Sequence, residues 1–342
     1  MPLRDPRLQA ILDGAIPFAL PLRRRFRGVD VREGVLIRGP QGWGEFAPFD
    51  DYSHAAASRW LDCAIEAAYG SWPGAQRSEV EVNAIIPEVS SDVAATMARA
   101  AVAESGCRTI KVKVGGADLA ADEARVATVR DVLDTLLGRG RGALRVDANG
   151  AWDTASAATA LRRLGAYDLE YVEQPCRGVD DLRGLRRLTD VPIAVDETIR
   201  ESADPAGVRV REFADVAVVK AAPLGGARAA LRVAESMEVP VVVSGSLDSS
   251  VGLDAAVALA AALPDLPYAC GLGTGALLAA DVVDEPRVPV GGVLAVSRTS
   301  PDLPALLSAR DRLTDERAEW WRVRIALAWE AGSAERVGSV VA

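Results

Sequence analysis

Apolar residues follow one repeat in the first part of the chain and a different one after about residue 79. In the first part, glycine-bounded runs at Gly34–Gly39 and Gly42–Phe46 have the length and composition of strands. His54–Tyr69 then carries the apolar spacing of a helix. This pattern predicts a small α+β domain over residues 1–78.

From residue 79 to about residue 280, short β-branched runs alternate with alanine-rich stretches of helical length. Eight such units in succession predict a parallel (β/α)-barrel. A doubly wound open sheet is the competing fold, but it needs a glycine-rich turn after its first strand, and Ile86–Val89 offers none. The eight runs are Val80–Ile86, Thr109–Val114, Leu144–Asn149, Tyr171–Gln174, Ile193–Glu197, Val216–Lys220, Pro240–Ser244 and Tyr268–Gly271.

The remaining segment, residues 281–342, contains one more strand-like run at Gly292–Val296 and a tryptophan-containing helix near Glu316–Trp329. We expect this segment to pack back on the barrel and on the N-terminal cap.

Composition narrows the class of protein. The 342 residues carry a net charge of −9, which argues against a nucleic-acid-binding face. The basic run Arg23–Arg25 is short and reads as a solvated strand edge or loop. Four widely spaced cysteines, no signal-peptide pattern and no apolar run long enough for a bilayer predict a cytoplasmic protein that does not insert into membranes.

Two lysines lie in the second strand of the predicted barrel, at Lys111 and Lys113. Strand alternation places both side chains on one face, with Ile110, Val112 and Val114 on the other. For a lone Lys-x-Lys the ordinary interpretation is an edge strand whose lysines lie in water. Facing inward, the same lysines would need partners, because unpaired buried ammonium groups are costly.

The next three strands supply those partners. Asp147, Glu173 and Asp196 each follow an apolar run and stand at the carboxyl end of a predicted strand, where barrel active sites lie. Each acid alone could be a helix N-cap or a surface residue. Three in phase would repel one another unless a cation joined them, and hard oxygen ligands suit Mg²⁺, with Mn²⁺ as a substitute.

Two neighbouring residues bear on that site. Glu197 competes with Asp196 as the third ligand, but alternation turns its side chain to the opposite face, so Asp196 is preferred. Asn149 lies two residues beyond Asp147, on the same face, and is a candidate to support the site or to bind substrate.

Lys220 ends the sixth apolar run, so it should lie across the lumen from Lys111 and Lys113. A lysine beside a dication and other lysines has a lowered pKa and can act as a base. A bound metal would stabilise the enediolate formed when a proton is removed next to a carboxylate. The residues therefore indicate a metal-assisted proton abstraction from a small carboxylate substrate.

The ordered set Lys-x-Lys, Asp, Glu, Asp, Lys from Lys111 to Lys220 resembles that of the enolase superfamily, in its muconate-lactonising subgroup. The likeness extends over the whole chain. Within the subgroup, the chain most resembles the o-succinylbenzoate synthase family of actinobacterial type. The stretches that carry this likeness are Ile110–Val114, Val146–Trp152, Glu173–Pro175, Val195–Thr198, Ser244–Gly252 and Ala269–Gly275.

The resemblance implies a barrel modified as in that superfamily and a dehydratase of menaquinone biosynthesis. It also implies roles for single residues. Lys113 would be the base, Lys111 would lower the pKa of Lys113 and help to hold the substrate carboxylate, and Lys220 would stabilise the enediolate from the opposite face. Asp147, Glu173 and Asp196 would bind Mg²⁺.

Specificity should lie in loops with small residues after the last two strands and in the cap. Backbone N–H groups there could receive a second substrate carboxylate, although glycines also serve simply to make tight turns. The segment Phe49–Ser53 is the candidate lid, and the single histidine, His54, reads as a helix-start residue. The candidate substrate-binding residues are Asn149, Ser244, Gly245, Gly271 and Leu272.

Other activities on the same scaffold stay open at this stage, above all N-succinylamino acid racemase, which needs lysines on both faces of the site. Muconate cycloisomerase fits the catalytic core alone. Dipeptide epimerases use Asp-x-Asp where this chain has Gly271-Leu272-Gly273. A catalytically inactive scaffold would have lost one of the lysines or ligands, and a zinc hydrolase would need more histidines than one. Nothing in the sequence predicts the oligomeric state.

Overall fold

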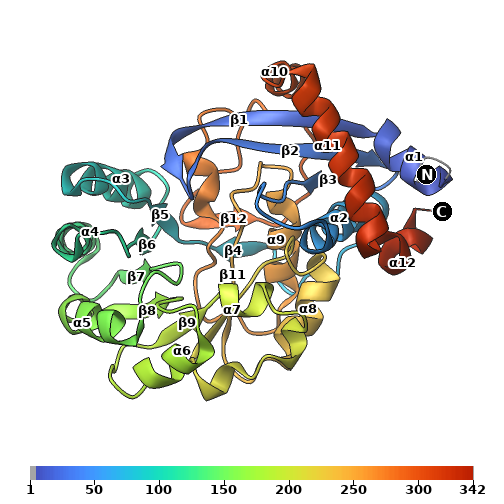
Figure 1. The fold of residues 1–342 in the computed structure, drawn as a ribbon. Coiled ribbons are helices and arrows are strands. Elements are labelled where there is room, and N and C mark those ends of the chain that lie inside the picture. The colour runs from blue at the N-terminus through green and yellow to red at the C-terminus, as the bar shows by residue number, and fades with distance from the viewer. Residues whose placement is uncertain (1–4, 342) are drawn as a thin grey trace.

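The computed structural model describes residues 5–341. These residues form an antiparallel sheet with helices on one side of the molecule and a ring of parallel strands surrounded by helices on the other (Figure 1). The prediction of a (β/α)-barrel with an α+β cap is confirmed.

The cap is built on three antiparallel strands in sequence order: β1 (Ala15–Phe26), β2 (Val29–Gly39) and β3 (Gly42–Phe46). Helix α1 (Pro6–Asp13) precedes them. Helix α2 (His54–Tyr69) packs against β3 and has the predicted bounds. The sequence did not reveal β1, because prolines interrupt its apolar run and three exposed arginines end it.

His54 opens α2 and is exposed, as expected of a helix-start residue. The helix is capped by the Ser53 side chain, whose oxygen accepts a hydrogen bond from the Ala56 amide at 3.2 Å.

The barrel sheet contains seven parallel strands that follow one another in sequence order, each joined to the next by a helical connection. Its interior holds a small apolar cluster around Tyr171 and Val218, and a larger core lies between the strands and the outer helices. The strands are β5 (Ala84–Ile86), β6 (Thr109–Lys113), β7 (Ala143–Asp147), β8 (Leu169–Glu173), β9 (Ile193–Val195), β10 (Val216–Val219) and β11 (Val241–Val243). The helices are α3 (Ser91–Ala103), α4 (Leu119–Leu137), α5 (Thr154–Leu164), α6 (Val179–Leu185), α7 (Glu197–Arg200), α8 (Ala227–Ser236) and α9 (Leu253–Ala262).

Two predicted strands differ from the structure. The first run is broken: β4 (Glu79–Glu81) pairs antiparallel with β12 (Val293–Ala295), and only β5 joins the barrel. The eighth run is reduced to single bridges, Val82 with Cys270 and Ser244 with Gly271, which close the ring. Proline before this run and glycines after it keep it from extending.

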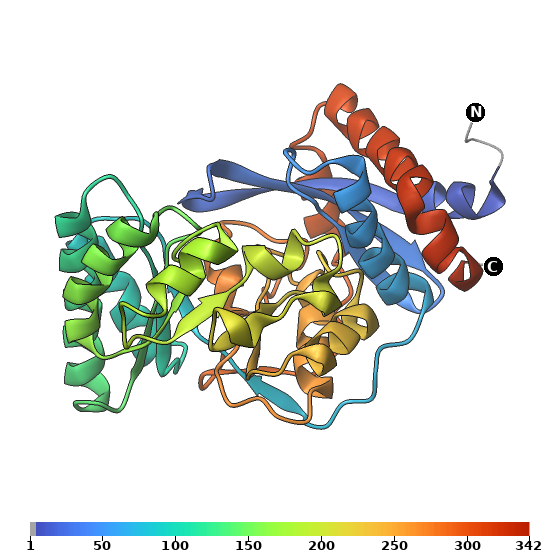
Figure 2. The same cartoon turned by 60° about the horizontal axis from the view of Figure 1, so that its bottom comes forward.

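The end of the chain returns to the cap. Helices α10 (Leu303–Arg310) and α11 (Asp315–Ala328), the π-helical turn η5 (Trp329–Ser333) and α12 (Ala334–Val337) follow β12. Trp321, Ile325 and Trp329 are buried in one apolar cluster with Trp60 and Phe46 of the cap. Figure 2 shows these red helices lying along the blue strands, to one side of the barrel.

Among the described residues, no helix is long and apolar enough to span a membrane. The basic run Arg23–Arg25 is exposed at the end of β1, which agrees with its interpretation as a solvated strand edge.

Gly44 allows β3 to approach α2 closely, because a Cβ placed on it would lie 1.9 Å from the Ala64 carbonyl oxygen. We expect Gly44→Ala to lower the free energy of unfolding by about 1–3 kcal/mol, as overpacking a core does. Gly74→Ala is the matched control, since its Cβ would meet nothing within 4 Å. Urea unfolding of both variants tests this, and equal midpoints would show that the close approach is not a constraint.

Candidate active site

The carboxyl ends of β6, β7 and β8 bring two lysines and two acids together inside the barrel. Lys113 is the register partner of Asp147, and Asp147 is the register partner of Glu173. The Lys111 Nζ lies 2.8 Å from Glu173 Oε2 and 3.2 Å from Asp147 Oδ2. The Lys113 Nζ lies 2.6 Å from the same Asp147 oxygen. Strand β6 lies between β5 and β7, so the alternative of an edge strand with lysines in water is wrong.

The next two strands complete the cluster from the other side. Asp196 directly follows β9 and Lys220 directly follows β10. The Lys220 Nζ lies 2.7 Å from Asp196 Oδ2, and the Arg200 Nε lies 3.1 Å from Asp196 Oδ1. All three predicted acids and all three predicted lysines therefore lie in one buried cluster of opposite charges.

Glu197 does not point away from the site, so that part of the prediction is wrong. Strand β9 ends at Val195 and helix α7 begins at Glu197, so the alternation of a strand no longer applies there. The Glu197 Oε1 accepts hydrogen bonds from Asn149 Nδ2 at 3.1 Å and from Arg200 Nη2 at 2.8 Å. Glu197 thus lies at the rim of the site, while Asp196 faces Lys220 inside it.

The two lysines of β6 differ in their electrostatic surroundings. Burial lowers the pKa of Lys111, but the carboxylates of Glu173 and Asp147 outweigh burial, so the pKa is raised above its ordinary value. Burial also lowers the pKa of Lys113; Asp147 opposes this, whereas Lys111 and Arg27 add to it, and the pKa stays lowered. Lys113 is therefore the member of the pair that loses a proton more easily.

The acids differ in the same way. Burial raises the pKa of Asp196, but Lys220 and Arg200 outweigh it and lower the pKa to about 2. Burial also opposes ionisation of Asp147, yet Lys113 and Lys111 hold its pKa below the ordinary range. Glu173 is the exception, because burial and the nearby Asp147 raise its pKa despite the contact with Lys111.

A pocket opens directly above this cluster. Four of the five candidate substrate-binding residues line it: Asn149, Ser244, Gly245 and Gly271. The Asn149 Oδ1 accepts a hydrogen bond from Lys113 Nζ at 2.5 Å. Leu272 is the exception: its side chain is fully buried in the barrel core and does not line the pocket, because the chain turns inward beyond Gly271.

The cap contributes pocket residues that the sequence did not single out. Phe26 and Arg27 lie at the turn between β1 and β2, and the Lys113 Nζ lies 5.5 Å from the centre of the Phe26 ring. Arg27 has φ of 50° and is followed by Gly28 with φ of 79°, so the turn is left-handed. An Arg-Gly pair between two strands indicates such a turn, but the sequence does not show that the turn reaches the barrel.

Thr274 is another pocket residue that the sequence did not single out. It lies in the turn η4 (Gly273–Leu277), lines the same pocket and is 7% exposed. Within residues 5–341, its Oγ1 has no hydrogen-bond partner. A buried hydroxyl without a partner costs free energy, so Thr274 is a candidate to contact a polar group of the substrate.

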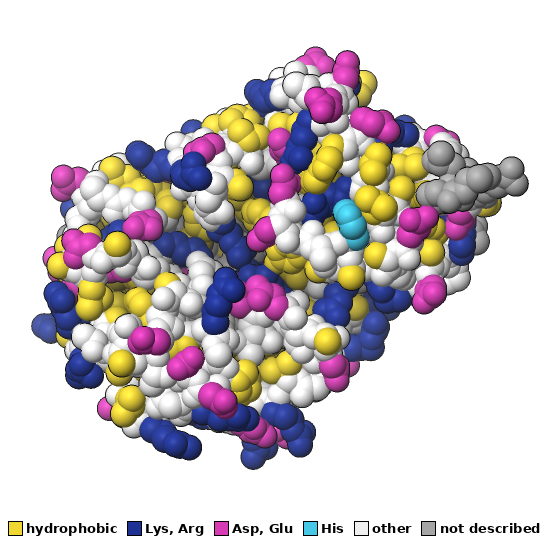
Figure 3. Space-filling model, in the orientation of Figure 1, with side chains coloured by type: hydrophobic (Ala, Val, Ile, Leu, Met, Phe, Trp, Pro, Cys, Tyr) yellow, Lys and Arg dark blue, Asp and Glu magenta, His cyan; other side chains and the backbone are white. Residues whose placement is uncertain are grey.

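A wider outer pocket lies between the cap and the barrel. Arginines and acidic residues line it together, and so do Phe49 and Tyr52 of the predicted lid segment. Figure 3 shows basic side chains gathered in this hollow. The Tyr52 hydroxyl is hydrogen-bonded to Arg200, which connects the cap loop to the residue that holds Asp196.

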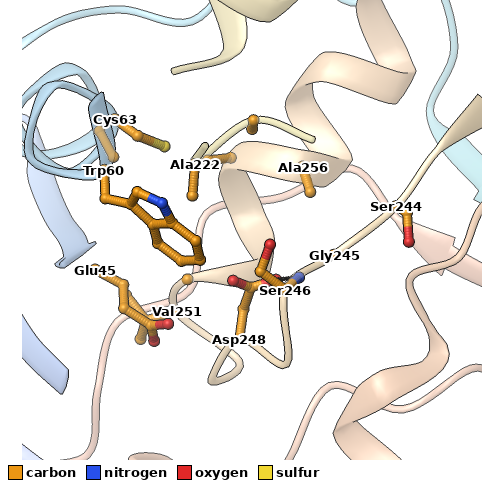
Figure 4. A pocket seen from close by; sticks show the side chains of 14 residues that line it. Glu45, Trp60, Cys63, Ala222, Ser244, Gly245, Ser246, Asp248, Val251 and Ala256 are labelled. Carbon is orange, nitrogen blue, oxygen red and sulfur yellow. Dashed lines mark hydrogen bonds between the residues drawn. The ribbon is translucent and has the colours of Figure 1, made fainter. Parts of the chain in front are cut away.

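The cap also holds the loop that follows β11. Glu45 of β3 reaches into this loop, where its Oε2 accepts a hydrogen bond from the Ser249 amide at 3.1 Å. Gly252 leaves room for it, because a Cβ there would lie 2.5 Å from Glu45 Cδ. Figure 4 shows Glu45, Trp60 and Asp248 around the small cavity at this junction. Since the loop begins with Ser244 and Gly245, Glu45 indirectly fixes one wall of the pocket.

The donor set fits a hard divalent cation. All three acids offer carboxylate oxygens at neighbouring strand ends, and Glu173 Oε1 is buried without a hydrogen-bond partner among the described residues. Within residues 5–341, no three His, Cys, Asp or Glu side chains are grouped as metal ligands. Each of the three acids contacts a lysine. The oxygens therefore suit Mg²⁺ chemically, and the ammonium groups neutralise them in this structure.

Sequence comparisons match the two parts of the chain to the enolase superfamily. Residues 18–68 match the model of the enolase N-terminal domain-like family, and residues 93–303 match that of the enolase C-terminal domain-like family. The o-succinylbenzoate synthase of Thermobifida fusca is 51% identical over 90% of this chain and 96% of its own length. That of Mycobacterium tuberculosis (strain H37Rv) is 48% identical over 94% of this chain and 95% of its own length.

Solved structures agree on the fold. The muconate lactonizing enzyme from Pseudomonas fluorescens superimposes with a TM-score of 0.74 at 24% identity, over 86% of this chain and 97% of that one. The L-Ala-D/L-Glu epimerase from Bacillus subtilis gives 0.71 at 23% identity, over 84% and 96%. These identities are low, so the likeness concerns the fold alone.

Burial of Glu45 generates a prediction about stability. Burial and the neighbouring Asp248 raise the pKa of Glu45 to about 7, although Arg32 opposes them. The pKa of Glu45 in the folded state exceeds its unfolded value of 4.5. The contribution of this carboxyl to stability is therefore fully present below pH 4.5 and is lost as the pH rises through about 7. Glu45→Gln should therefore gain about 1–3 kcal/mol of unfolding free energy relative to wild type between pH 5 and 8.

Urea unfolding of both proteins across that range measures the difference. Glu79→Gln, at an exposed position on β4, is the matched control and should show no such trend. A difference between Glu45→Gln and wild type that stays constant with pH would contradict a raised pKa at Glu45.

Proposed function

The chain belongs to the o-succinylbenzoate synthase family of the enolase superfamily, and from this membership we propose how its own residues carry out the reaction. The enzyme is a lyase of menaquinone biosynthesis that dehydrates 2-succinyl-6-hydroxy-2,4-cyclohexadiene-1-carboxylate to o-succinylbenzoate. A proton leaves the ring carbon next to the carboxylate, the neighbouring hydroxyl leaves as water, and the ring becomes aromatic.

Lys113 is the proposed base. Its lowered pKa allows the ammonium to lose a proton, and Asp147 and Asn149 accept hydrogen bonds that orient its Nζ toward the pocket. After it has taken the substrate proton, the same ammonium can return it to the departing hydroxyl. The single observation that supports this assignment best is the place of Lys113 at the end of β6, where it lines the pocket and is hydrogen-bonded to Asn149, whereas Lys111 lies between two acids.

Lys111 and Lys220 are proposed as permanent positive charges on either side of the reacting carbon. Lys111 lies two residues before Lys113 on β6. Lys220 follows β10, where it contacts Asp196. Both would stabilise the negative charge that develops on the substrate carboxylate when the proton leaves. Neither needs to change its protonation state during the reaction.

Membership of the superfamily implies a divalent metal, and we propose Mg²⁺ held by Asp147, Glu173 and Asp196. When bound, it would neutralise the substrate carboxylate and the enediolate. The free Oε1 of Glu173 supports this ligand set. The lysines that contact these acids here would then turn toward the substrate.

The succinyl group is proposed to lie toward the loops after β11 and after the bridge at Gly271. Asn149, Ser244, Gly245 and Gly271 line that side of the pocket, together with the free hydroxyl of Thr274. The inner pocket is small, and the cap residues Phe26 and Arg27 line it. A ring with one short acidic branch suits such a space better than an extended substrate.

Other activities of the subgroup are not favoured, because relatives at 48–51% identity over most of the chain are named o-succinylbenzoate synthase. The likeness to the L-Ala-D/L-Glu epimerase, at 23% identity, is one of fold alone.

We further propose that the chain divides into a cap over residues 1–78, a barrel over residues 79–280 and a C-terminal segment over residues 281–342. Four free, buried cysteines fit the reducing cytoplasm as the place of the reaction. The partner is a small carboxylate substrate.

The first test measures turnover of the cyclohexadiene substrate with Mg²⁺, after EDTA, and in Lys113→Ala. We expect metal-dependent loss of the diene absorbance, and a fall in kcat of about 10²–10⁴ in the variant, the usual contribution of a general base. Lys111→Ala keeps the base but removes a neighbouring charge that lowers the pKa of Lys113, so it should move the rise of kcat/KM to higher pH. A folded, Mg²⁺-loaded protein without turnover would refute the proposal.

Thr274→Val tests the substrate contact. Loss of one hydrogen bond should lower kcat/KM about twofold to tenfold. Because the hydroxyl has no partner among residues 5–341, the same change should leave the melting temperature equal or raise it. A structural role would instead lower both activity and melting temperature, and unchanged kcat/KM would exclude the contact.

A further inference from the structure

A further cavity lies behind the reaction pocket, beside β5. It is bounded by β5, helix α3, the turn η4 and the end of β1, and has a volume of about 360 Å³. Figure 1 shows the end of β1 beside α3 and β5, where this cavity lies. The proposed reaction uses none of the side chains on its outer side.

The walls of this cavity are apolar. Ile85, Ile86 and Leu277 form its sides, Met97 of α3 faces them, and the fully buried Cys107 lies among the lining residues. Methionine and cysteine side chains are soft and adapt to irregular apolar ligands. An aliphatic chain would therefore find contact along most of its length.

The opening carries a different chemistry. Arg23 and Arg24 of β1 line it, and both are exposed. Within residues 5–341, neither guanidinium takes part in an ion pair or a side-chain hydrogen bond, whereas the neighbouring Arg25 pairs with Asp30 at 3.0 Å. Glu104 also lines the cavity, so the opening keeps a net charge of +1 on a chain whose net charge is −9.

We propose that this cavity binds an aliphatic carboxylate, with its chain between β5 and α3 and its head group at Arg23 and Arg24. Charge complementarity selects an anionic head group, and the depth of the apolar walls selects the chain. A carboxylate with no aliphatic chain would gain only weak, exposed ion pairs.

The site shares a wall with the reaction pocket. Ile85 and Gly273 line both cavities, and Ile85 is the register partner of Lys111 in the sheet. A ligand in contact with Ile85 therefore acts on the strand pair β5–β6, which carries Lys111 and Lys113. Binding of the carboxylate and of the substrate should be coupled, so that each changes the apparent affinity of the other.

Calorimetric titration of the full chain with decanoate, below its micelle concentration, tests the proposal. We expect one saturable site, no comparable binding of 1-decanol, and a Kd raised about threefold to tenfold in the double variant Arg23→Gln/Arg24→Gln. Arg25→Gln is the control, because it removes a positive charge from the same strand outside the cavity, and its Kd should equal that of wild type. Ala101→Phe, which fills the cavity from α3, should abolish binding.

The outcomes separate this site from the reaction pocket. Lys113→Ala should bind decanoate as wild type does, and decanoate should change the substrate KM in wild type but not in Ala101→Phe. Equal binding of decanol, an unchanged Kd in Arg23→Gln/Arg24→Gln, or simple competition with substrate that survives Ala101→Phe would overturn the proposal. The double arginine variant lies on an exposed strand end and keeps the test valid if Ala101→Phe does not fold.

Discussion

The structure depends on one constraint: six charged side chains are buried together at the carboxyl ends of β6 to β10. Removing a charge from water costs several kcal/mol, so such a cluster persists only when each charge is paired at close range. Here Lys111, Lys113 and Lys220 face Asp147, Glu173 and Asp196 at distances of 2.6 to 3.2 Å. The strand register enforces these pairs, because it aligns Lys113 with Asp147 and Asp147 with Glu173. The parallel barrel therefore provides both the fold and the charge balance of the site.

The cap matters because the barrel alone leaves this cluster open to water. The turn between β1 and β2 places Phe26 and Arg27 over Lys113, and Arg27 contributes to the lowered pKa of that lysine. Glu45 fixes the loop after β11 through the Ser249 amide. In turn, Trp321 and Trp329 pack against helix α2, which covers the cap sheet. The two ends of the chain thus stabilise the cap, and Arg27 of the cap lowers the pKa of Lys113 on β6.

The catalytic cluster was predictable because its residues lie on regular strands, where position in the sequence dictates both face and end. Lys111, Lys113, Asp147 and Glu173 obey that rule. The rule failed where a strand stops: Glu197 turns back to the rim because α7 begins there, and Leu272 turns into the core. Arg27 and Thr274 could not be found, since their places in the pocket depend on how distant segments pack rather than on local pattern.

The charge balance of the cluster also explains which substrate suits it. With Lys113 protonated, the three ammonium groups and three carboxylates sum to zero, and Arg200 and Glu197 beside them add one charge of each sign. A dication and a substrate with two carboxylates bring charges of +2 and −2, and together they leave that balance unchanged. Either one alone would place an uncompensated double charge in a low-dielectric interior, which is costly. The buried cluster therefore favours joint binding of the two, and a substrate with two carboxylates matches it better than a substrate with one.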